Sequence, residues 1–228
     1  MNLYILLSEK KWHKSLFVKL QKKYQDRAEW LLINNPGEFT LEKLDKLNPD
    51  KIFIPHWSYI IDRQIYEKYK CIVFHMTDLP YGRGGSPLQN LIIRGLKRTK
   101  ITAIKVNQGI DSGDIYLKKN LSLDGTAREI FERAVPVIQK MIIQIIEEKI
   151  IPQPQTGEVV LFNRRKPEEG NINDLKELEK IYDYIRMLDC EGYPKAFIET
   201  ENFKIDFSKA QFNQEQNYID AHVRIYKK

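Results

Sequence analysis

Short apolar runs alternate with amphipathic stretches along the first 75 residues. Leu3 to Leu7 is an uninterrupted apolar run, which predicts a buried strand, and residues 11–24 carry apolar side chains at helical spacing. Further elements expected on the same grounds are strands at 30–33, 51–54 and 71–74 and helices at 41–47 and 62–69. Apolar strands that alternate with helices are typical of a parallel α/β sheet covered on both faces.

The middle of the chain continues this pattern after a glycine- and proline-rich loop, LPYGRGGSP. Ser86 is expected to cap a helix through Arg94, with Pro87 at the first helical position. Alternating residues predict strands at 100–107 and 114–123 around a polar turn. An apolar stripe predicts a long helix over residues 126–150, which Pro152 and Pro154 end.

Residues 152–157 are the best linker candidate, because two alternate prolines stiffen an extended polar segment. We therefore expect a catalytic domain at 1–155 and a smaller subdomain at 156–228. The subdomain is expected to contain a strand at 159–162, a helix at 174–188 and strands at 196–200, 203–207 and 218–225. About 70 residues are too few for a large independent core.

Composition narrows the class of protein. The 228 residues are 42% hydrophobic, which excludes a disordered chain, and the net charge of +6 suits an anionic partner without identifying one. The lysine pairs are better explained as a solvated face than as a nucleic-acid site. The two cysteines, Cys71 and Cys190, have no metal-ligand spacing and indicate a reducing compartment. Because the N-terminus does not resemble a signal peptide and no membrane span is visible, we expect a cytoplasmic protein.

Two residues carry candidate chemistry at the predicted strand ends. His75 directly follows an apolar strand, and Asp111 lies in the tight turn IDSGD. Ligands of open parallel sheets bind beyond the carboxyl ends of the strands. A lone histidine at a strand end is more often structural, but a carboxylate beside it can orient the imidazole for acid/base work.

The loop after His75 can approach a ligand closely. Gly82, Gly84 and Gly85 free its backbone, and Arg83 adds a cation. No dinucleotide or P-loop fingerprint is present, which disfavours nicotinamide and P-loop nucleotides. The absence of GxSxG and HExxH removes the common hydrolase and zinc-protease classes.

The segment HMTDLPYGRGGSP at 75–87, followed by IDSGD at 110–114, resembles the active site of formyltransferases that use 10-formyltetrahydrofolate. That family has the motif N-x-H-x-S-L-L-P-x-x-R-G-x-x-P and, further on, D-x-G. The resemblance extends from the first strand to the end of the long helix. It implies a Rossmann-like domain with a parallel or mixed sheet, here followed by a small α+β C-terminal subdomain, and a folate-dependent N-formyltransferase without a metal.

The resemblance also implies roles for individual residues. His75 would move protons or steady the oxyanion, and Asp111 would orient His75 and a water molecule. The family's asparagine two residues before the histidine is Val73 here. Three explanations remain open: Thr77 or a backbone N–H replaces the asparagine, the enzyme is weaker, or the protein is no longer catalytic. Thr77 is taken as the third catalytic candidate.

Folate and substrate residues follow from the same resemblance. The folate pocket is expected between the segments 56–61 and 107–111, where backbone groups are better candidates than side chains, since ordinary packing would also explain His56, Trp57 and Tyr59. The expected cofactor-binding residues are Tyr59, Ile60, Ile61, Asn107, Gln108, Ile110 and Asp111. The expected substrate-binding residues are Tyr81, Gly82, Arg83, Gly84, Arg164 and Arg165.

The subdomain suggests the acceptor. A short tail without a dense basic stripe, with a YPKAF segment at 193–197, looks most like enzymes that formylate nucleotide-linked deoxyamino sugars. We therefore expect a UDP- or dTDP-linked amino sugar as substrate, for cell-surface polysaccharide synthesis, with no nucleic-acid or membrane partner and a possible homodimer. The alternatives are a formyltransferase acting on a tRNA- or carrier-bound amino acid, and a non-catalytic basic binding module.

Overall fold

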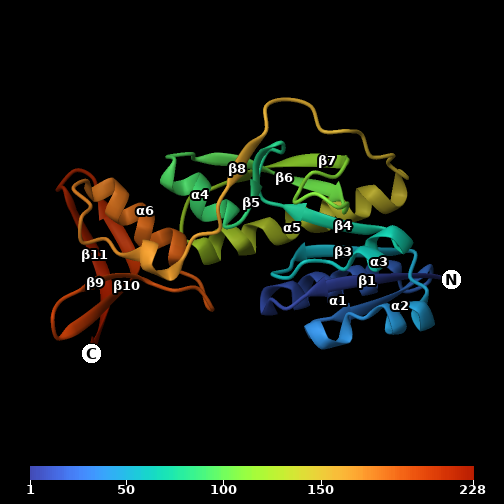
Figure 1. The fold of residues 1–228 in the computed structure, drawn as a ribbon, viewed down its shortest axis with the longest axis horizontal. Coiled ribbons are helices and arrows are strands. Elements are labelled where there is room, and N and C mark those ends of the chain that lie inside the picture. The colour runs from blue at the N-terminus through green and yellow to red at the C-terminus, as the bar shows by residue number, and fades with distance from the viewer. The chain divides into compact units, whose positions relative to one another are not determined.

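A computed structural model describes all residues, 1–228. Its largest element is a six-stranded sheet with the strand order β2-β1-β3-β4-β6-β7 (Figure 1). The strands are β1 (Asn2–Ser8), β2 (Ala28–Ile33), β3 (Lys51–His56), β4 (Cys71–His75), β6 (Arg98–Lys105) and β7 (Ile115–Ser122). Strands β1 to β4 are mutually parallel, and β6 runs antiparallel to β4. The carboxyl ends of β1, β3 and β4 therefore share one edge of the sheet.

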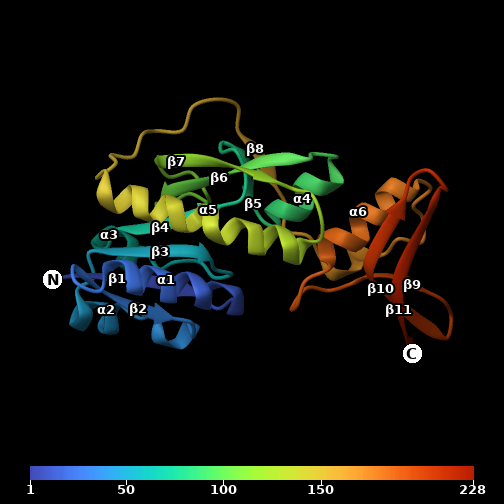
Figure 2. The same ribbon diagram turned by 180° about the vertical axis from the view of Figure 1, so that it is seen from behind.

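Helices cover both faces of this sheet, because successive side chains of its strands are buried alternately above and below. Ile5 and Leu7 of β1 pack in a cluster with residues of α2 and α3, whereas Tyr4 packs on the opposite face beside Trp30. Views from the two sides show α5 along a single face (Figures 1 and 2). The helices are α1 (Lys14–Tyr24), α2 (Leu41–Leu47), α3 (Arg63–Lys68), α4 (Pro87–Ile93), α5 (Ala127–Glu147) and α6 (Leu178–Leu188), with 3-10 turns η1 (Lys11–His13), η2 (Pro36–Glu38) and η3 (Pro167–Gly170).

The predicted fold class is confirmed. Thr40 caps α2, accepting a hydrogen bond from the Lys43 amide at 3.3 Å. Ser86 is the N-cap residue of α4 and Pro87 its first helical residue, as predicted, but Ser86 has a φ of 49° and its side chain makes no capping hydrogen bond. Its hydroxyl instead accepts a hydrogen bond from the Arg165 amide at 3.0 Å. A contact distant in sequence has taken the side chain that a local cap would use.

The segment expected to be a linker, 152–157, and the residues after it form backbone hydrogen bonds with β7 and with Pro80. The Ile115 amide donates to the Gln153 carbonyl at 2.7 Å, and the Gln153 amide donates back at 2.9 Å. The Val160 amide donates to the Pro80 carbonyl at 3.3 Å. Beyond it, β8 (Val160–Phe162) pairs with β5 (Tyr81–Gly84) in a two-stranded sheet. Residues 151–161 therefore form a strap that is tied to the glycine loop and to β7.

The C-terminal part contains a three-stranded antiparallel sheet of β9 (Ala196–Glu199), β10 (Phe203–Asn213) and β11 (Tyr218–Lys227), against which α6 packs (Figure 2). The rings of Tyr182 and Phe212 lie 5.8 Å apart in that contact. Arg186 is buried, and its guanidinium donates to the carbonyls of Leu123 and Gly125 at 2.6 and 2.9 Å and to Asp183 at 2.6 Å. These bonds satisfy a charge that burial alone would make costly.

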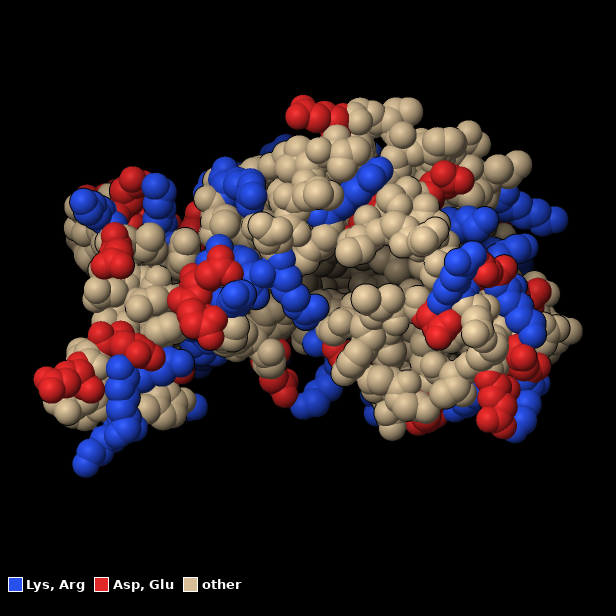
Figure 3. Space-filling view, in the orientation of Figure 1, with Lys and Arg blue, Asp and Glu red and all other residues tan.

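Contacts divide the chain into two interleaved units. The first contains residues 1–84, 100–121 and 132–161, and the second contains residues 85–99, 122–131 and 162–228. Each unit is discontinuous in sequence, so the domain boundary at residue 155 stays a prediction. No helix combines the length and apolar character that a membrane crossing requires. Positive and negative side chains are interspersed on the face shown in Figure 3.

Candidate active site

His75 ends β4 and is almost completely buried, with 7% of its surface exposed. Its Nε2 lies 2.8 Å from the carbonyl oxygen of Gly82, and its Nδ1 lies 3.5 Å from Oδ2 of Asp111. Because a carbonyl oxygen can only accept a hydrogen bond, Nε2 carries a proton in this arrangement. The imidazole is therefore held between a backbone acceptor and a carboxylate.

Asp111 reaches His75 from a tight turn between β6 and β7. Its φ of 48° lies in the left-handed region, which non-glycine residues rarely adopt. Its Oδ2 accepts a hydrogen bond from the Gly84 amide at 2.9 Å. The same carboxylate oxygen thus faces both the imidazole of His75 and the glycine loop. The structure brings together the two residues that the sequence analysis paired.

Thr77 also converges on the Gly82 carbonyl. Its side chain is fully buried, and Oγ1 donates to that carbonyl oxygen at 3.3 Å. The Thr77 carbonyl accepts from Oγ1 of Thr102 at 2.6 Å. In this geometry the Thr77 hydroxyl holds the loop that covers His75. Its catalytic role stays a prediction.

Val73 contributes no polar group to the site. It is half-buried, packs against the apolar cluster above the sheet, and has Ile54 and Ile104 as its partners on the two neighbouring strands. Val73 and its two strand partners, Ile54 and Ile104, carry no side-chain hydrogen-bond donor.

The base of the glycine loop is anchored by charge. Asp78 forms ion pairs with Lys100 and Lys118, and Lys118 also donates to the Leu79 carbonyl. Burial raises the pKa of Asp78, but the hydrogen bonds from Lys118 and Lys100 outweigh it and hold that pKa below its ordinary value. The carboxylate therefore stays ionised at neutral pH, and the loop start is fixed to β6 and β7.

The two segments predicted to bind folate expose apolar side chains. Tyr59 is 54% exposed, Ile60 95% and Ile110 72%. Asn107 and Gln108 are also exposed, while Ile61 is half-buried. Large exposed apolar side chains on two loops of one unit are suited to cover a flat aromatic ring. The residues present therefore fit a pterin, and the assignment of the pocket stays a prediction.

The predicted substrate-binding residues fall into two groups. Tyr81 to Gly84 form β5. The Gly82 carbonyl lies 2.8 Å from Nε2 of His75. Arg83 donates through Nε and Nη2 to Oε1 of Gln155 at 3.1 and 2.8 Å. Arg164 and Arg165 belong to the second contact unit. Arg165 donates to the Glu169 carbonyl at 2.6 Å and lies over the Tyr184 ring, so its guanidinium is already engaged. Arg164 is exposed and packs its backbone against Gly85.

Two other histidines lie in the first unit near the carboxyl edge of the sheet. His13 is buried, and its Nδ1 lies 2.7 Å from the Ser8 hydroxyl. Burial, with the charges of His56 and Lys10, lowers the pKa of His13 to about 3, and burial with Lys10 lowers that of His56 to about 3. Both rings stay neutral near pH 7, so neither is suited to act as a general acid at that pH.

The depressed pKa of His13 predicts a loss of stability in acid. In the unfolded chain His13 binds a proton near pH 6.5, and in the folded chain only near pH 3. The stability that the neutral His13 allows is therefore fully present above pH 6.5 and is lost as the pH falls, because protonation favours the unfolded chain. Between pH 7 and pH 5 the wild type should lose about 2 kcal/mol more stability than His13→Gln, measured by urea unfolding. His222→Gln, at an exposed position, should behave like the wild type. An equal acid loss in His13→Gln would refute this assignment.

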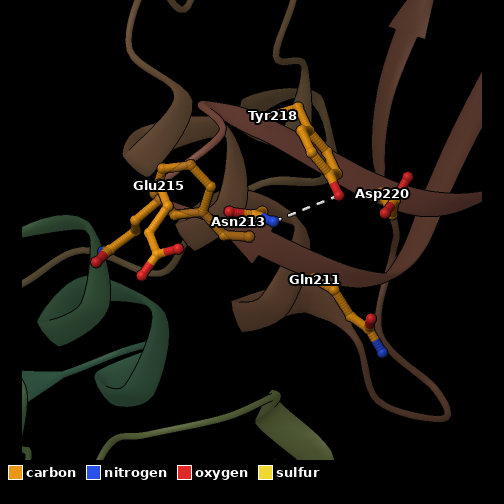
Figure 4. A pocket seen from close by; sticks show the side chains of 7 residues that line it. Gln211, Asn213, Glu215, Tyr218 and Asp220 are labelled. Atoms are coloured by element: carbon orange, nitrogen blue, oxygen red, sulfur yellow. Dashed lines mark hydrogen bonds between the residues drawn. The ribbon is translucent and has the colours of Figure 1, made fainter.

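A surface cavity of about 470 Å³ lies elsewhere, at the β10–β11 hairpin. It is lined by Gln211, Phe212, Asn213, Gln214, Glu215, Tyr218 and Asp220. Figure 4 shows Asn213 reaching toward the Tyr218 hydroxyl, at 3.4 Å, with the Glu215 and Asp220 carboxylates nearby. None of the residues predicted to act in catalysis or binding lines it. The assignment of the chemistry to His75 stays a prediction.

Sequence reasoning missed Gln155 and the close approach at Gly113. Gln155 lies in the segment interpreted as a linker, and no motif marks it. A β-carbon built on Gly113 would overlap the Lys105 carbonyl oxygen, so glycine is required there. The D-x-G motif pointed to Gly113, whereas only the tertiary contacts identify Gln155. No group of three or more histidine, cysteine, aspartate or glutamate side chains is arranged to hold a metal ion.

Two family models match the chain. The model described as formyl transferase matches residues 18–146, and that described as the C-terminal domain of methionyl-tRNA formyltransferase matches residues 167–226. Among curated proteins, the methionyl-tRNA formyltransferase of Thermodesulfovibrio yellowstonii is 31% identical over 173 residues, which are 72% of this chain. The aligned part spans 56% of that relative's length.

Solved structures agree with this match. A methionyl-tRNA formyltransferase from Clostridium thermocellum is 48% identical, covers all of both chains and has a TM-score of 0.97. A sugar N-formyltransferase from a Shewanella species has a TM-score of 0.70 at 16% identity, covering 88% of this chain and 94% of that chain. The second likeness is one of fold alone.

Proposed function

Because the chain belongs to the formyl transferase family, whose model matches more than half of it, we propose that it transfers the formyl group of 10-formyltetrahydrofolate to the amino group of methionyl-tRNA. The observation that carries the choice of acceptor is the match of residues 167–226 to the C-terminal domain of methionyl-tRNA formyltransferases. The family confirms the predicted enzyme class, folate-dependent formyl transfer, and with it the co-substrate. The cytoplasmic location remains part of the proposal.

The predicted sugar-nucleotide acceptor is wrong. The relatives at 31% and 48% identity are methionyl-tRNA formyltransferases, whereas the sugar N-formyltransferase shares 16% identity. The expectation of cell-surface polysaccharide synthesis and of no nucleic-acid partner is overturned with it. The error came from inferring the acceptor from the length of the C-terminal subdomain and a few of its turn residues. These features do not define a binding surface. The alternative that named a tRNA-bound amino acid fits better.

The reaction requires one proton to change places. The amine attacks the formyl carbon, an oxyanion forms, and the folate N10 leaves with a proton that the amine gives up. In our proposal the imidazole of His75 assists this proton transfer or steadies the oxyanion, for which its Nε2–H must leave the Gly82 carbonyl that it binds in the structure. Oδ2 of Asp111 lies 3.5 Å from the other ring nitrogen and would orient the ring for this role. Burial of His75 strengthens both interactions by excluding water.

The chain's own residues would hold the two substrates by different means. The co-substrate supplies the activated formyl group, and the exposed apolar side chains of Ile60 and Ile110 would cover its ring system. A net charge of +6 favours approach of a polyanionic tRNA over a neutral acceptor. We keep the predicted homodimer as a proposal; Val223 and Ile225 of β11 are 52% and 62% exposed.

Formylation of purified acceptors tests the proposal. With 10-formyltetrahydrofolate, methionyl-tRNA should gain one formyl group, with a kcat/KM at least about 100-fold above that for free methionine, since the tRNA supplies remote binding energy. Uncharged tRNA measures binding without a reactive amine, and a UDP- or dTDP-linked amino sugar serves as the competing acceptor. Transfer to the amino sugar without transfer to methionyl-tRNA would reject the proposed acceptor. Absence of transfer to any amine would reject the activity.

A further inference from the structure

The side chain of Gln155 connects the glycine loop, through Arg83, with the turn that carries Asp111. Its Oε1 accepts hydrogen bonds from Nε and Nη2 of Arg83 at 3.1 and 2.8 Å. Its Nε2 donates to the carbonyl oxygens of Asp111 and Gly113, both at 2.8 Å. The amide thus uses both acceptor positions and both donor hydrogens. We propose that Gln155 is a positioning residue that sets the Asp111 turn relative to His75 for formyl transfer.

The Asp111 turn needs such support. Asp111 holds a left-handed backbone conformation that costs energy in a residue with a β-carbon, and such conformations persist only where surroundings over-determine them. The two carbonyls that Gln155 binds flank Ser112 and belong to the turn itself. A donor that bridges them fixes the turn's curvature, and the curvature sets where the Asp111 carboxylate points.

The strap holds Gln155 firmly enough to do this. Gln153 exchanges two backbone hydrogen bonds with Ile115, directly after the turn, and the Val160 amide donates to the carbonyl of Pro80, three residues before Arg83. Gln155 is half-buried between these two anchors, whereas Gln153, Pro154 and Thr156 are exposed. Both anchors and all four side-chain bonds lie within the first contact unit. A flexible linker would not provide a fixed amide at this point.

The two halves of the amide can be separated by substitution. Gln155→Ala removes both the acceptor and the donors. Gln155→Glu keeps an acceptor for Arg83, where it gains an ion pair, but loses the donors and sets a carboxylate against two carbonyls. If positioning of the Asp111 turn is the role, both variants lose activity. If only the anchoring of Arg83 matters, Gln155→Glu retains it.

The test rests on the proposed function for its activity readout. We expect Gln155→Ala and Gln155→Glu to lower kcat for methionyl-tRNA formylation by about 10- to 100-fold, with the KM for methionyl-tRNA within about threefold of wild type. Gln153→Ala is the matched control, because its amide reaches only the Ile151 carbonyl at 3.4 Å and its backbone bonds survive. It should match the wild type. Equal thermal midpoints would show that the variants fold.

Hydrogen exchange provides a second readout that needs no turnover. Backbone amides of residues 107–114 should exchange faster in Gln155→Ala and Gln155→Glu than in the wild type. In Gln153→Ala their exchange rates should equal those of the wild type. Wild-type kcat in Gln155→Ala, or in Gln155→Glu, would overturn the inference. So would unchanged exchange in the turn. If the wild type itself formylates no acceptor, the proposed function fails, and the exchange experiment alone decides whether Gln155 holds the turn.

Discussion

Replacing His75 with alanine is expected to lower kcat for formyl transfer by about 100- to 10,000-fold, the range for removing a positioned acid/base group. The imidazole is the only titratable side chain that the structure holds against the Asp111 carboxylate, with its other nitrogen on the Gly82 carbonyl. His13 and His56 are held neutral by burial and cannot take over. Single-turnover formylation of methionyl-tRNA measures the chemical step directly.

The control for this variant is His222→Ala, since His222 is exposed on β11. It should retain wild-type kcat. Asp111→Asn keeps the size of the side chain and removes its charge, so it should also lower kcat, by a smaller factor than His75→Ala because the imidazole remains. Turnover of His75→Ala within about threefold of wild type would remove His75 from the mechanism.

Gly113→Ala is expected to lower kcat by about 100-fold although residue 113 carries no reactive group. The new methyl group would overlap the Lys105 carbonyl oxygen, which belongs to the backbone of β6 and cannot rotate away. The turn must then move as a whole, and Asp111 moves with it. We also expect a loss of about 1–3 kcal/mol in the free energy of unfolding, the usual cost of overpacking. Single-turnover kinetics measures the change in kcat, and urea unfolding measures the change in stability.

Gly37→Ala is the matched control for that variant. Its added β-carbon would meet only the Asn35 side-chain oxygen, at an ordinary 3.5 Å, so little change is expected in either measurement. If Gly113→Ala is as active and as stable as Gly37→Ala, the turn tolerates displacement. The tight approach to β6 would then have no part in setting the Asp111 carboxylate.

Local pattern was sufficient for most of the secondary structure. The apolar run at Leu3 to Leu7 became β1, and the stripe through Ile138 and Ile145 became the buried face of α5. Each of these elements is stabilised mainly by burying its own periodic side chains, which the order of residues encodes directly. Ser86 occupies the predicted N-cap position, but its hydroxyl accepts a long-range hydrogen bond from the Arg165 amide instead of capping the helix.

The acceptor was the other place where local reasoning failed. A count of about 70 residues and a few turn motifs favoured a sugar nucleotide, whereas residues 167–226 match the C-terminal domain of methionyl-tRNA formyltransferases. Recognition of a large ligand depends on a surface assembled from many elements. The spacing of motif residues within one segment does not show how such a surface is assembled.

The sequence by itself determined the parallel/mixed α/β fold class, the formyltransferase family and the pairing of His75 with Asp111, because periodicity and two spaced motifs express them locally. Only the tertiary structure decided how the Asp111 turn is held. Residue 155 lies 44 positions from Asp111 and 72 from Arg83, and hydrogen bonds across such separations depend on where the folded backbone places each group. A glutamine in a proline-rich stretch carries no sign of that placement.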